Sequence, residues 1–187
     1  MRIVVGISGA SGIIYGVRLL QALKELNVEV HLTMTNLAVK IAKLEEDIDR
    51  EDIVKLAAYY YDVDDLTAPI ASGSFTHDGM VIAPCSMKTL AGIANGYADN
   101  LLLRAADVTL KEGRKLILVP RETPLSVIHL RNMLTLAEAG VIILPAMPAF
   151  YGRPKSIKDL VDYVVGRVLD QLKIRHKLYE RWGGPRV

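Results

Sequence analysis

The opening of the chain constrains its fold most strongly. An unbroken apolar strand pattern at residues 2–7 runs into a loop made only of Ser, Gly and Ala at residues 8–12. A helical pattern begins directly afterwards, at Ile13. Small residues let a ligand approach the backbone, and the first amides of a helix have no partners within it, so this junction is typical of an anion site. It is equally typical of a plain tight connection between a strand and a helix.

The glycine spacing in this loop bears on the kind of ligand. Gly6, Gly9 and Gly12 follow the pattern Gly-x-x-Gly-x-x-Gly, whereas dinucleotide folds use Gly-x-Gly-x-x-Gly. A mononucleotide phosphate is therefore at least as good a candidate as NAD. Ser8 and Ser11 add hydroxyl donors to the loop.

Strand and helix patterns alternate along the rest of the chain without a break in composition. Further apolar strand patterns lie at residues 28–34, 80–83, 116–119 and 141–145. We predict helices at residues 13–26, 37–43, 53–60, 87–95, 100–111 and 125–139, and a last long helix from a capping box at Ser156 and Asp159. This alternation predicts a single α/β domain with a three-layer Rossmann-like or flavodoxin-like fold, in which helices flank a mostly parallel sheet.

Ligands of such sheets bind beyond the carboxyl ends of the strands, and this rule brings five separated segments together. The segments are residues 8–12, 35–36, 84–89, 120–122 and 146–151. They are rich in Gly, Ser, Thr, Arg, Pro and Tyr. Because two helix starts and an arginine lie among them, we expect a phosphorylated ligand.

Composition excludes several other classes. The 187 residues include one cysteine, Cys85, and four scattered histidines, so we expect neither a disulfide nor a metal site. A net charge of +2 is too small to indicate nucleic acid, and no apolar run reaches the length of a membrane span, so we expect a cytoplasmic protein without such partners. The hydrophobic content of 51% fits either a large core or buried subunit contacts.

Seven motifs together resemble the UbiX-type flavin prenyltransferases, in family order and over essentially the whole chain. They lie at residues 6–16, 71–74, 84–86, 104–112, 119–124, 149–151 and 181–183. One departure is Leu66, where some relatives place tryptophan, so the wall of the isoprenoid pocket and the preferred chain length stay open.

The resemblance implies a homododecamer that binds FMN. It implies that a dimethylallyl group passes from dimethylallyl monophosphate to reduced FMN, with bonds at N5 and C6 and without a metal. The prenylated FMN would serve a UbiD-type decarboxylase. Residues 1–187 would then form one FMN-binding flavoprotein domain, in which residues 174–187 are a tail that closes an active site of the same or a neighbouring subunit.

The resemblance also implies roles for residues at matching positions. Glu122 would transfer protons, and Glu45, Ser11 and Lys111 would be further catalytic residues. The implied FMN site contains Gly9, Ala10, Ser11, Thr35, Ser86, Met87, Lys88, Thr89, Arg104 and Arg121. The implied site for the substrate contains Lys111, Arg121, Tyr151, Arg167 and Trp182. Arg, Lys and Tyr together are suited to stabilise a departing phosphate.

Alternatives to these roles come from the residues themselves. Arg104, Lys111 and Arg167 also fit solvated helix ends, Glu45 fits one more exposed acid, and Trp182 fits an interface anchor.

Two other functions stay open at this point: a flavin-dependent cysteine decarboxylase of the same fold, and a non-catalytic FMN-binding partner subunit. The decarboxylases rely on a helix histidine and an Asn-rich motif, which have no clear equivalent in this chain. Arg121, Glu122 and Tyr151 fit phosphate chemistry better than thiol chemistry.

Overall fold

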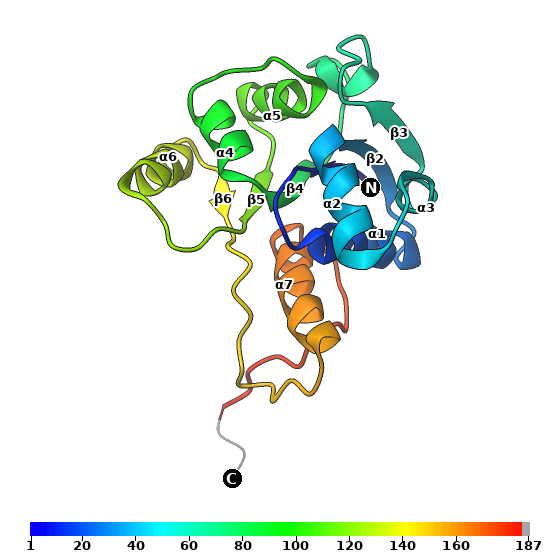
Figure 1. The fold of residues 1–187 in the computed structure, drawn as a ribbon, viewed down its shortest axis with the longest axis vertical. Coiled ribbons are helices and arrows are strands. Elements are labelled where there is room, and N and C mark those ends of the chain that lie inside the picture. Colours follow the sequence, from blue (N-terminus) through cyan, green and yellow to red (C-terminus); the bar gives the residue numbers. More distant parts are fainter. Residues whose placement is uncertain (185–187) are drawn as a thin grey trace.

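The computed structural model describes residues 1–184 and contains a six-stranded sheet between two layers of helices (Figure 1). The strands are β1 (Arg2–Ile7), β2 (Glu29–Met34), β3 (Tyr59–Asp62), β4 (Gly79–Cys85), β5 (Leu116–Pro120) and β6 (Ile142–Ile143). Their order is β3-β2-β1-β4-β5-β6, and all neighbours are parallel. This is the strand order of doubly wound Rossmann-like folds, so the predicted fold class is confirmed.

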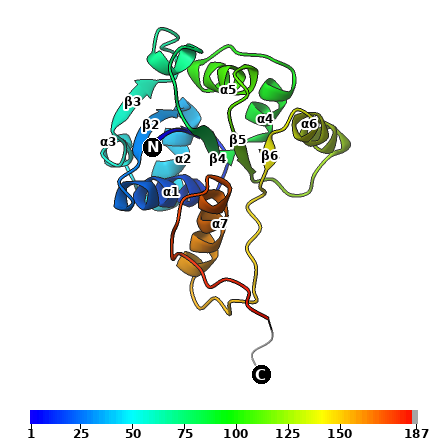
Figure 2. The ribbon, with the colours of Figure 1, turned by 180° about the vertical axis from the view of Figure 1, so that it is seen from behind.

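Helices cover both faces of the sheet (Figure 2). The helices are α1 (Ile13–Glu25), α2 (Asn36–Glu46), α3 (Arg50–Val54), α4 (Met87–Ala94), α5 (Leu101–Lys111), α6 (Val127–Glu138) and α7 (Ile157–Gln171), with a 3-10 turn, η1 (Pro69–Ala71). Buried residues of α1, α2, α3 and α7 form one apolar cluster, and those of α4, α5 and α6 form the other. Val5 of β1 points into the first cluster and Val4 into the second, as alternate residues of a strand must. Burial on both faces explains why the strands are almost continuously apolar.

Short polar side chains determine where most helices begin. Thr35, Ser86 and Asn100 each accept a hydrogen bond from the amide three residues ahead. The predicted capping box at the start of α7 is present, with Ser156 as its first residue. Because Thr35 and Ser86 directly follow β2 and β4, their caps place two helix starts at the carboxyl edge of the sheet.

The predicted helix at residues 53–60 is wrong. Helix α3 ends at Val54, and residues 59–62 form the edge strand β3, which pairs with β2. Aromatic residues favour strands, and here Tyr59 and Tyr61 stack on His31 of β2 with ring centroids 4.6 and 5.8 Å away.

The boundaries of three other elements also differ from the prediction. Helix α6 begins after Ser126, not at residue 125, because Ser126 and His129 form a reciprocal capping box. Helix α2 continues to Glu46, beyond the predicted end at residue 43, so Glu45 lies within the helix. Strand β6 is only two residues long and ends before Pro145, which has no backbone N–H to donate to a neighbouring strand.

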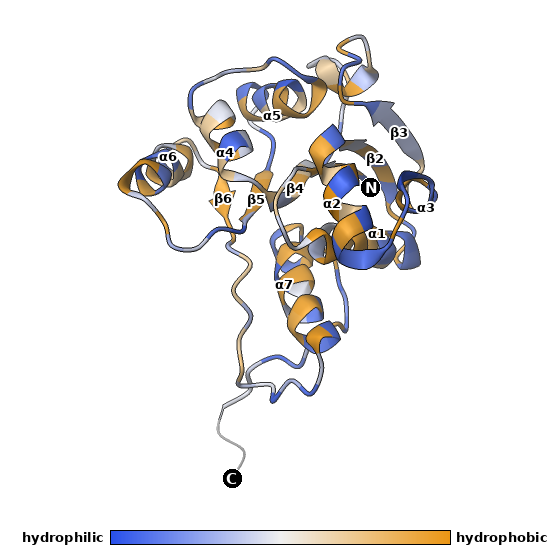
Figure 3. Cartoon of the chain, viewed as in Figure 1, coloured by the Kyte–Doolittle hydropathy of each residue, from blue (hydrophilic) through white to orange (hydrophobic). Residues whose placement is uncertain are grey.

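Beyond β6 the chain leaves the sheet. The segment between β6 and α7 runs alongside α7, and the C-terminal tail returns along the other side of the helix and meets that segment near the start of α7 (Figures 1 and 2). Helix α6 stands at the side of the molecule with Val127, Ile128, Leu130 and Leu134 exposed, as the apolar colouring of this helix in Figure 3 illustrates. Such a patch is typical of a surface that another chain covers. None of the helices in residues 1–184 is long and apolar enough to cross a membrane.

Candidate active site

The loop after β1 contacts three other loops at the carboxyl edge of the sheet. Ser8 Oγ donates to the Pro84 carbonyl at 3.0 Å and accepts from the Ser86 amide at 2.8 Å. Arg121 Nε donates to the Ser11 carbonyl at 3.0 Å, and the Thr35 amide donates to the end of β1. The Ala146 amide donates to the Pro120 carbonyl at 3.1 Å. Hydrogen bonds, one of them through the end of β1, therefore connect all five segments that the sequence predicted to meet.

The first amides of α1 bind an anion from the same chain. Glu45 Oε2 accepts from the Gly12 amide at 2.8 Å and from the Ile13 amide at 3.2 Å, and Ser11 adds a side-chain hydrogen bond. Partial burial tends to raise the pKa of Glu45, but these donors and the charge of Arg121 outweigh it, and the pKa is lowered. The carboxylate of Glu45 thus takes the place that the sequence offers to a phosphate.

Two further helix starts, those of α2 and α4, lie at the same edge. Thr35 Oγ1 accepts from the Ala38 amide at 3.2 Å, and Ser86 Oγ accepts from the Thr89 amide at 3.2 Å. Lys88 is exposed in the first turn of α4. The partial positive charge of these helix ends, with hydroxyls and a cation beside them, favours an anionic ligand.

Arg121 and Glu122 directly follow β5 and line a cavity of about 270 Å³. Leu125, Met133 and Met147 supply apolar walls to the same cavity. Glu122 Oε1 accepts from the neighbouring backbone, the amide of residue 123 at 3.1 Å, and the side chain is exposed. This cavity therefore joins a cation, a carboxylate and an apolar wall, an arrangement suited to a hydrophobic group that carries a phosphate.

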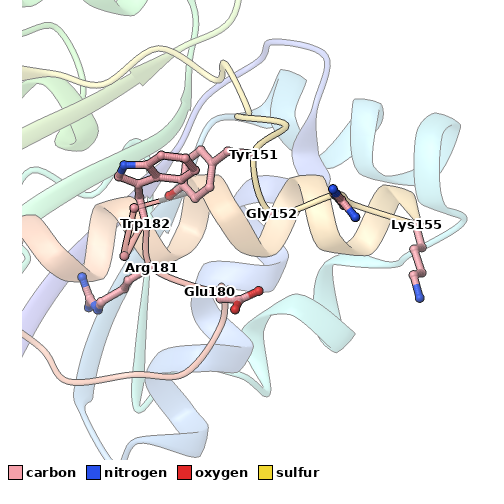
Figure 4. A pocket seen from close by; sticks show the side chains of 9 residues that line it. Tyr151, Gly152, Lys155, Glu180, Arg181 and Trp182 are labelled. Atoms are coloured by element: carbon pink, nitrogen blue, oxygen red, sulfur yellow. The ribbon is translucent and has the colours of Figure 1, made fainter. Parts of the chain in front are cut away.

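A second group of predicted residues lies beside α7. The rings of Tyr151 and Trp182 meet edge to face with centroids 5.6 Å apart, as Figure 4 shows. Both residues line a cavity of about 720 Å³, as do Arg153 and Arg181. Loss of hydration raises the pKa of the Tyr151 phenol, although Arg167 and Arg181 oppose this. The phenol therefore stays a hydrogen-bond donor among cations, which is typical of a phosphate site.

Arg167 of α7 faces a carboxylate that the sequence did not single out. Its Nε lies 3.9 Å from Asp170 Oδ2. Partial burial tends to raise the pKa of Asp170, but hydrogen bonds from Arg181, Tyr179 and His176 outweigh it and lower the pKa to about 2. One signal was available in the sequence, because a carboxylate in the last turn of a helix opposes the helix dipole and needs a partner.

Arg104 and Lys111 lie apart from both groups, on α5. Arg104 donates to the Ala71 carbonyl at 3.2 Å, and Lys111 pairs with Glu112 at 2.5 Å. Lys111 ends α5 shortly before β5 begins, at the amino edge of the sheet, whereas Arg121 follows β5 at the carboxyl edge. A site that uses both Lys111 and Arg121 therefore needs two copies of the chain.

Cys85 is fully buried, and this burial raises the pKa of its thiol. It is a core residue and not a nucleophile. Within residues 1–184, no group of three or more His, Cys, Asp or Glu side chains is placed to hold a metal ion.

The family model called Flavoprotein matches residues 1–169, so the chain belongs to the flavoprotein family. The chain is 54% identical over 183 residues to the flavin prenyltransferase UbiX of Methanocaldococcus jannaschii, which covers 98% of this chain and 99% of that one. Within the flavoproteins it is therefore a member of the UbiX-type flavin prenyltransferases, as its motifs predicted.

Two solved structures share this fold over nearly the whole chain. A dodecameric FMN-dependent UbiX-like decarboxylase from Escherichia coli O157:H7 is 54% identical, with a TM-score of 0.97 over 98% of this chain and 100% of that one. AnUbiX, in complex with FMN and dimethylallyl pyrophosphate, is 50% identical, with a TM-score of 0.97 over 99% of this chain and 98% of that one.

Proposed function

We propose that this chain transfers a dimethylallyl group from dimethylallyl monophosphate to reduced FMN. Bonds form to flavin N5 and C6, and inorganic phosphate is released. One observation carries the proposal. This chain, which is 54% identical to a flavin prenyltransferase over nearly its whole length, places Arg121 and Glu122 together beside an apolar cavity. The prenylated flavin would then pass to a UbiD-type decarboxylase.

The residues at the carboxyl edge fit FMN. The small side chains of Gly9, Ala10 and Ser11 suit a ligand that approaches the backbone, while Thr35 and residues 86–89 offer hydroxyls and helix-start amides to a phosphate. FMN supplies the nucleophilic positions to which the dimethylallyl group is joined. A relative of this chain, AnUbiX, has been solved with FMN and a dimethylallyl donor, which supports the same pairing here.

The departing phosphate needs charge stabilisation from side chains. We assign this to Tyr151, Arg167 and Arg121, with Lys111 from another copy, because a developing phosphate charge is best met by preorganised donors. The indole of Trp182 covers the same cavity as Tyr151 and would exclude water from an allylic cation.

Two carboxylates have different surroundings and so suit different tasks. Among residues 1–184, Glu122 has a backbone donor and no side-chain donor, and it is exposed and lies beside Arg121, so it is placed to exchange a proton with the phosphate. Glu45 is held by Ser11 and by the start of α1, so it would orient the Ser11 hydroxyl at the FMN site.

We propose that the complete site is shared between copies of residues 1–187, each copy acting as one FMN-binding domain in the cytoplasm. Lys111 lies on the amino side of the sheet and would serve a neighbour, as we propose for Arg104 in the first turn of the same helix, while the exposed apolar face of α6 would be covered. A relative from Escherichia coli is described as dodecameric, and we propose the same assembly.

Phosphate release tests the reaction. The purified protein is incubated anaerobically with dimethylallyl monophosphate, and inorganic phosphate is measured with reduced FMN, with oxidised FMN and without flavin. We expect release only with reduced FMN, and loss of release in Arg121→Ala with retained release in the surface variant Asp52→Asn. Equal release without flavin, or release neither of phosphate from the monophosphate nor of pyrophosphate from the diphosphate, would overturn the proposal and favour the decarboxylase or carrier alternatives.

Subunit complementation tests the shared site. Lys111→Ala and Arg121→Ala are expected to be inactive alone. Co-expression of the two variants should restore part of the activity, because some sites then receive Lys111 from one copy and Arg121 from another. If the mixed oligomer stays inactive while each variant assembles normally, both residues act within one copy.

A further inference from the structure

The C-terminal tail crosses α7 where the helix has no side chain. Gly166 is buried in the middle of α7, and a Cβ built there would lie 2.5 Å from Tyr179 Cδ1 and 2.8 Å from His176 Cε1. Glycine weakens a helix interior relative to alanine. Its presence at this crossing therefore indicates that the tail must pass close to the helix.

A single carboxylate on α7 accepts hydrogen bonds from three tail side chains. Asp170 Oδ1 accepts from Arg181 at 2.6 Å and from His176 Nε2 at 3.1 Å, and Oδ2 accepts from the Tyr179 hydroxyl at 2.5 Å. His176 Nδ1 accepts from a tail amide, the one of residue 178, at 3.2 Å, so the proton of a neutral ring is on Nε2 and points at Asp170. The His176 side chain is only 1% exposed. This carboxylate therefore fastens the tail to the helix.

A row of aromatic rings connects this fastening to the candidate phosphate site. The Tyr179 ring lies 5.0 Å from Tyr163 of α7, and Tyr163 lies 6.0 Å from Tyr151. Tyr151 in turn meets Trp182 at 5.6 Å. All three pairs meet at steep angles, the edge-to-face geometry that aromatic rings prefer. Movement of Tyr179 would therefore disturb the packing around Tyr151.

Arg167 lies next to the same carboxylate without being bound tightly by it. Its distance of 3.9 Å from Asp170 is longer than the 2.6 Å of Arg181, and its side chain is 44% exposed. Because Arg181, His176 and Tyr179 make the closer contacts with Asp170, its pairing with Arg167 is loose, and the half-exposed guanidinium of Arg167 can turn to another anion.

We infer that Asp170 and Gly166 are positioning residues, which hold residues 176–182 on α7 so that Tyr151 and Trp182 stand ready for the phosphate of the isoprenoid donor. The identity of the donor rests on the proposed function. The fastening itself does not, since it is a property of the protein without substrate.

The only tryptophan of the chain, Trp182, reports directly on the tail. Time-resolved fluorescence anisotropy of the full-length, flavin-free protein is compared for wild type, Asp170→Asn, Gly166→Ala and Tyr179→Phe. We expect a larger fast component in the three variants, because the tail rotates more freely. Asp52→Asn, which removes an exposed ion pair with Lys55, is the matched control and should equal wild type.

Steady-state kinetics then separate positioning from mere stability. In Asp170→Asn and Tyr179→Phe we expect the KM for dimethylallyl monophosphate to rise about tenfold, the scale of one lost charge-assisted hydrogen bond, with FMN affinity unchanged. Asp170→Glu, which keeps the charge, should recover part of the loss. Should Gly166→Ala fail to fold, Tyr179→Phe still decides the question.

Two results would overturn the inference. One is anisotropy like that of wild type in Asp170→Asn and Tyr179→Phe, which would mean that the tail is held by other contacts. The other is a freed tail with an unchanged KM, which would mean that the fastening serves no positioning. A wild-type protein without prenyl transfer would count against the proposed function alone, because the anisotropy result stands without substrate.

Discussion

The Glu45 carboxylate offers a sharp test of the loop after β1. In Glu45→Gln the side chain keeps its shape and one oxygen acceptor but loses the charge that faces the Gly12 and Ile13 amides at 2.8 and 3.2 Å. A negative charge at a helix start contributes about 0.3–1 kcal/mol, and a charged hydrogen bond exceeds a neutral one by a similar amount. Because the side chain is exposed and screened, we expect a total loss of about 1 kcal/mol.

Thermal unfolding can measure a loss of this size. For a chain of 187 residues, about 1 kcal/mol corresponds to a fall in Tm of about 2–4 °C. Glu46→Gln is the matched control, since Glu46 is exposed and makes no hydrogen bond or ion pair among the described residues, and it should stay within about 0.5 kcal/mol of wild type.

The pH dependence gives an internal check on the same variant. The folded-state pKa of Glu45 is lowered, so its stabilisation is present above the unfolded pKa of about 4.3 and is lost as the pH falls below it. The Tm difference between wild type and Glu45→Gln should therefore disappear in acid. If Glu45→Gln and Glu46→Gln have the same Tm at pH 7, Glu45 does not hold the start of α1.

Two further predictions concern stability. Asp170 has a folded-state pKa of about 2, so its ionised form should contribute about 2 kcal/mol to the free energy of unfolding above pH 4 and lose this contribution as the pH falls from about 4 to 2. The urea midpoints of wild type and Asp170→Asn should therefore converge in acid. Gly16→Ala places a Cβ 2.3 Å from the Ala83 carbonyl and should lower the free energy of unfolding in urea by about 3 kcal/mol. The control Gly152→Ala has open space around its Cβ and should be neutral. Equal urea midpoints for the two variants would refute the close contact of α1 with β4.

Much of the fold follows from patterns that depend on neighbouring residues only. Continuous apolar runs identified five of the six strands, because a parallel sheet buried on both faces needs them. The edge strand β3 was missed because Tyr59–Asp62 is short and its stability comes from stacking on His31, a contact between distant segments. The start of α6 was misplaced because His129 acts as a capping acceptor, a use of histidine that helix-start rules do not contain.

The candidate site likewise has one part that the sequence predicts and one part that it does not. The rule that ligands bind at carboxyl edges correctly placed Ser11, Thr35, Ser86 and Arg121 on one side of the sheet, because strand order alone determines this. The fastening by Asp170 depends on how an irregular tail folds back, and local patterns do not predict which residues of the tail meet the helix. Its sequence signals were an acidic residue at a helix end and a glycine inside a helix. The final residues of the predicted tail, 185–187, lie outside the described residues.

The mass of the flavin after turnover shows whether this chain joins a dimethylallyl group to FMN. The protein is incubated anaerobically with reduced FMN and dimethylallyl monophosphate, the bound cofactor is released, and its mass is measured beside a sample of Arg121→Ala. We expect a flavin heavier by one dimethylallyl unit in wild type and unmodified FMN in the variant. Unmodified FMN in wild type, with the donor or with its diphosphate, would contradict the assignment of this chain as a flavin prenyltransferase.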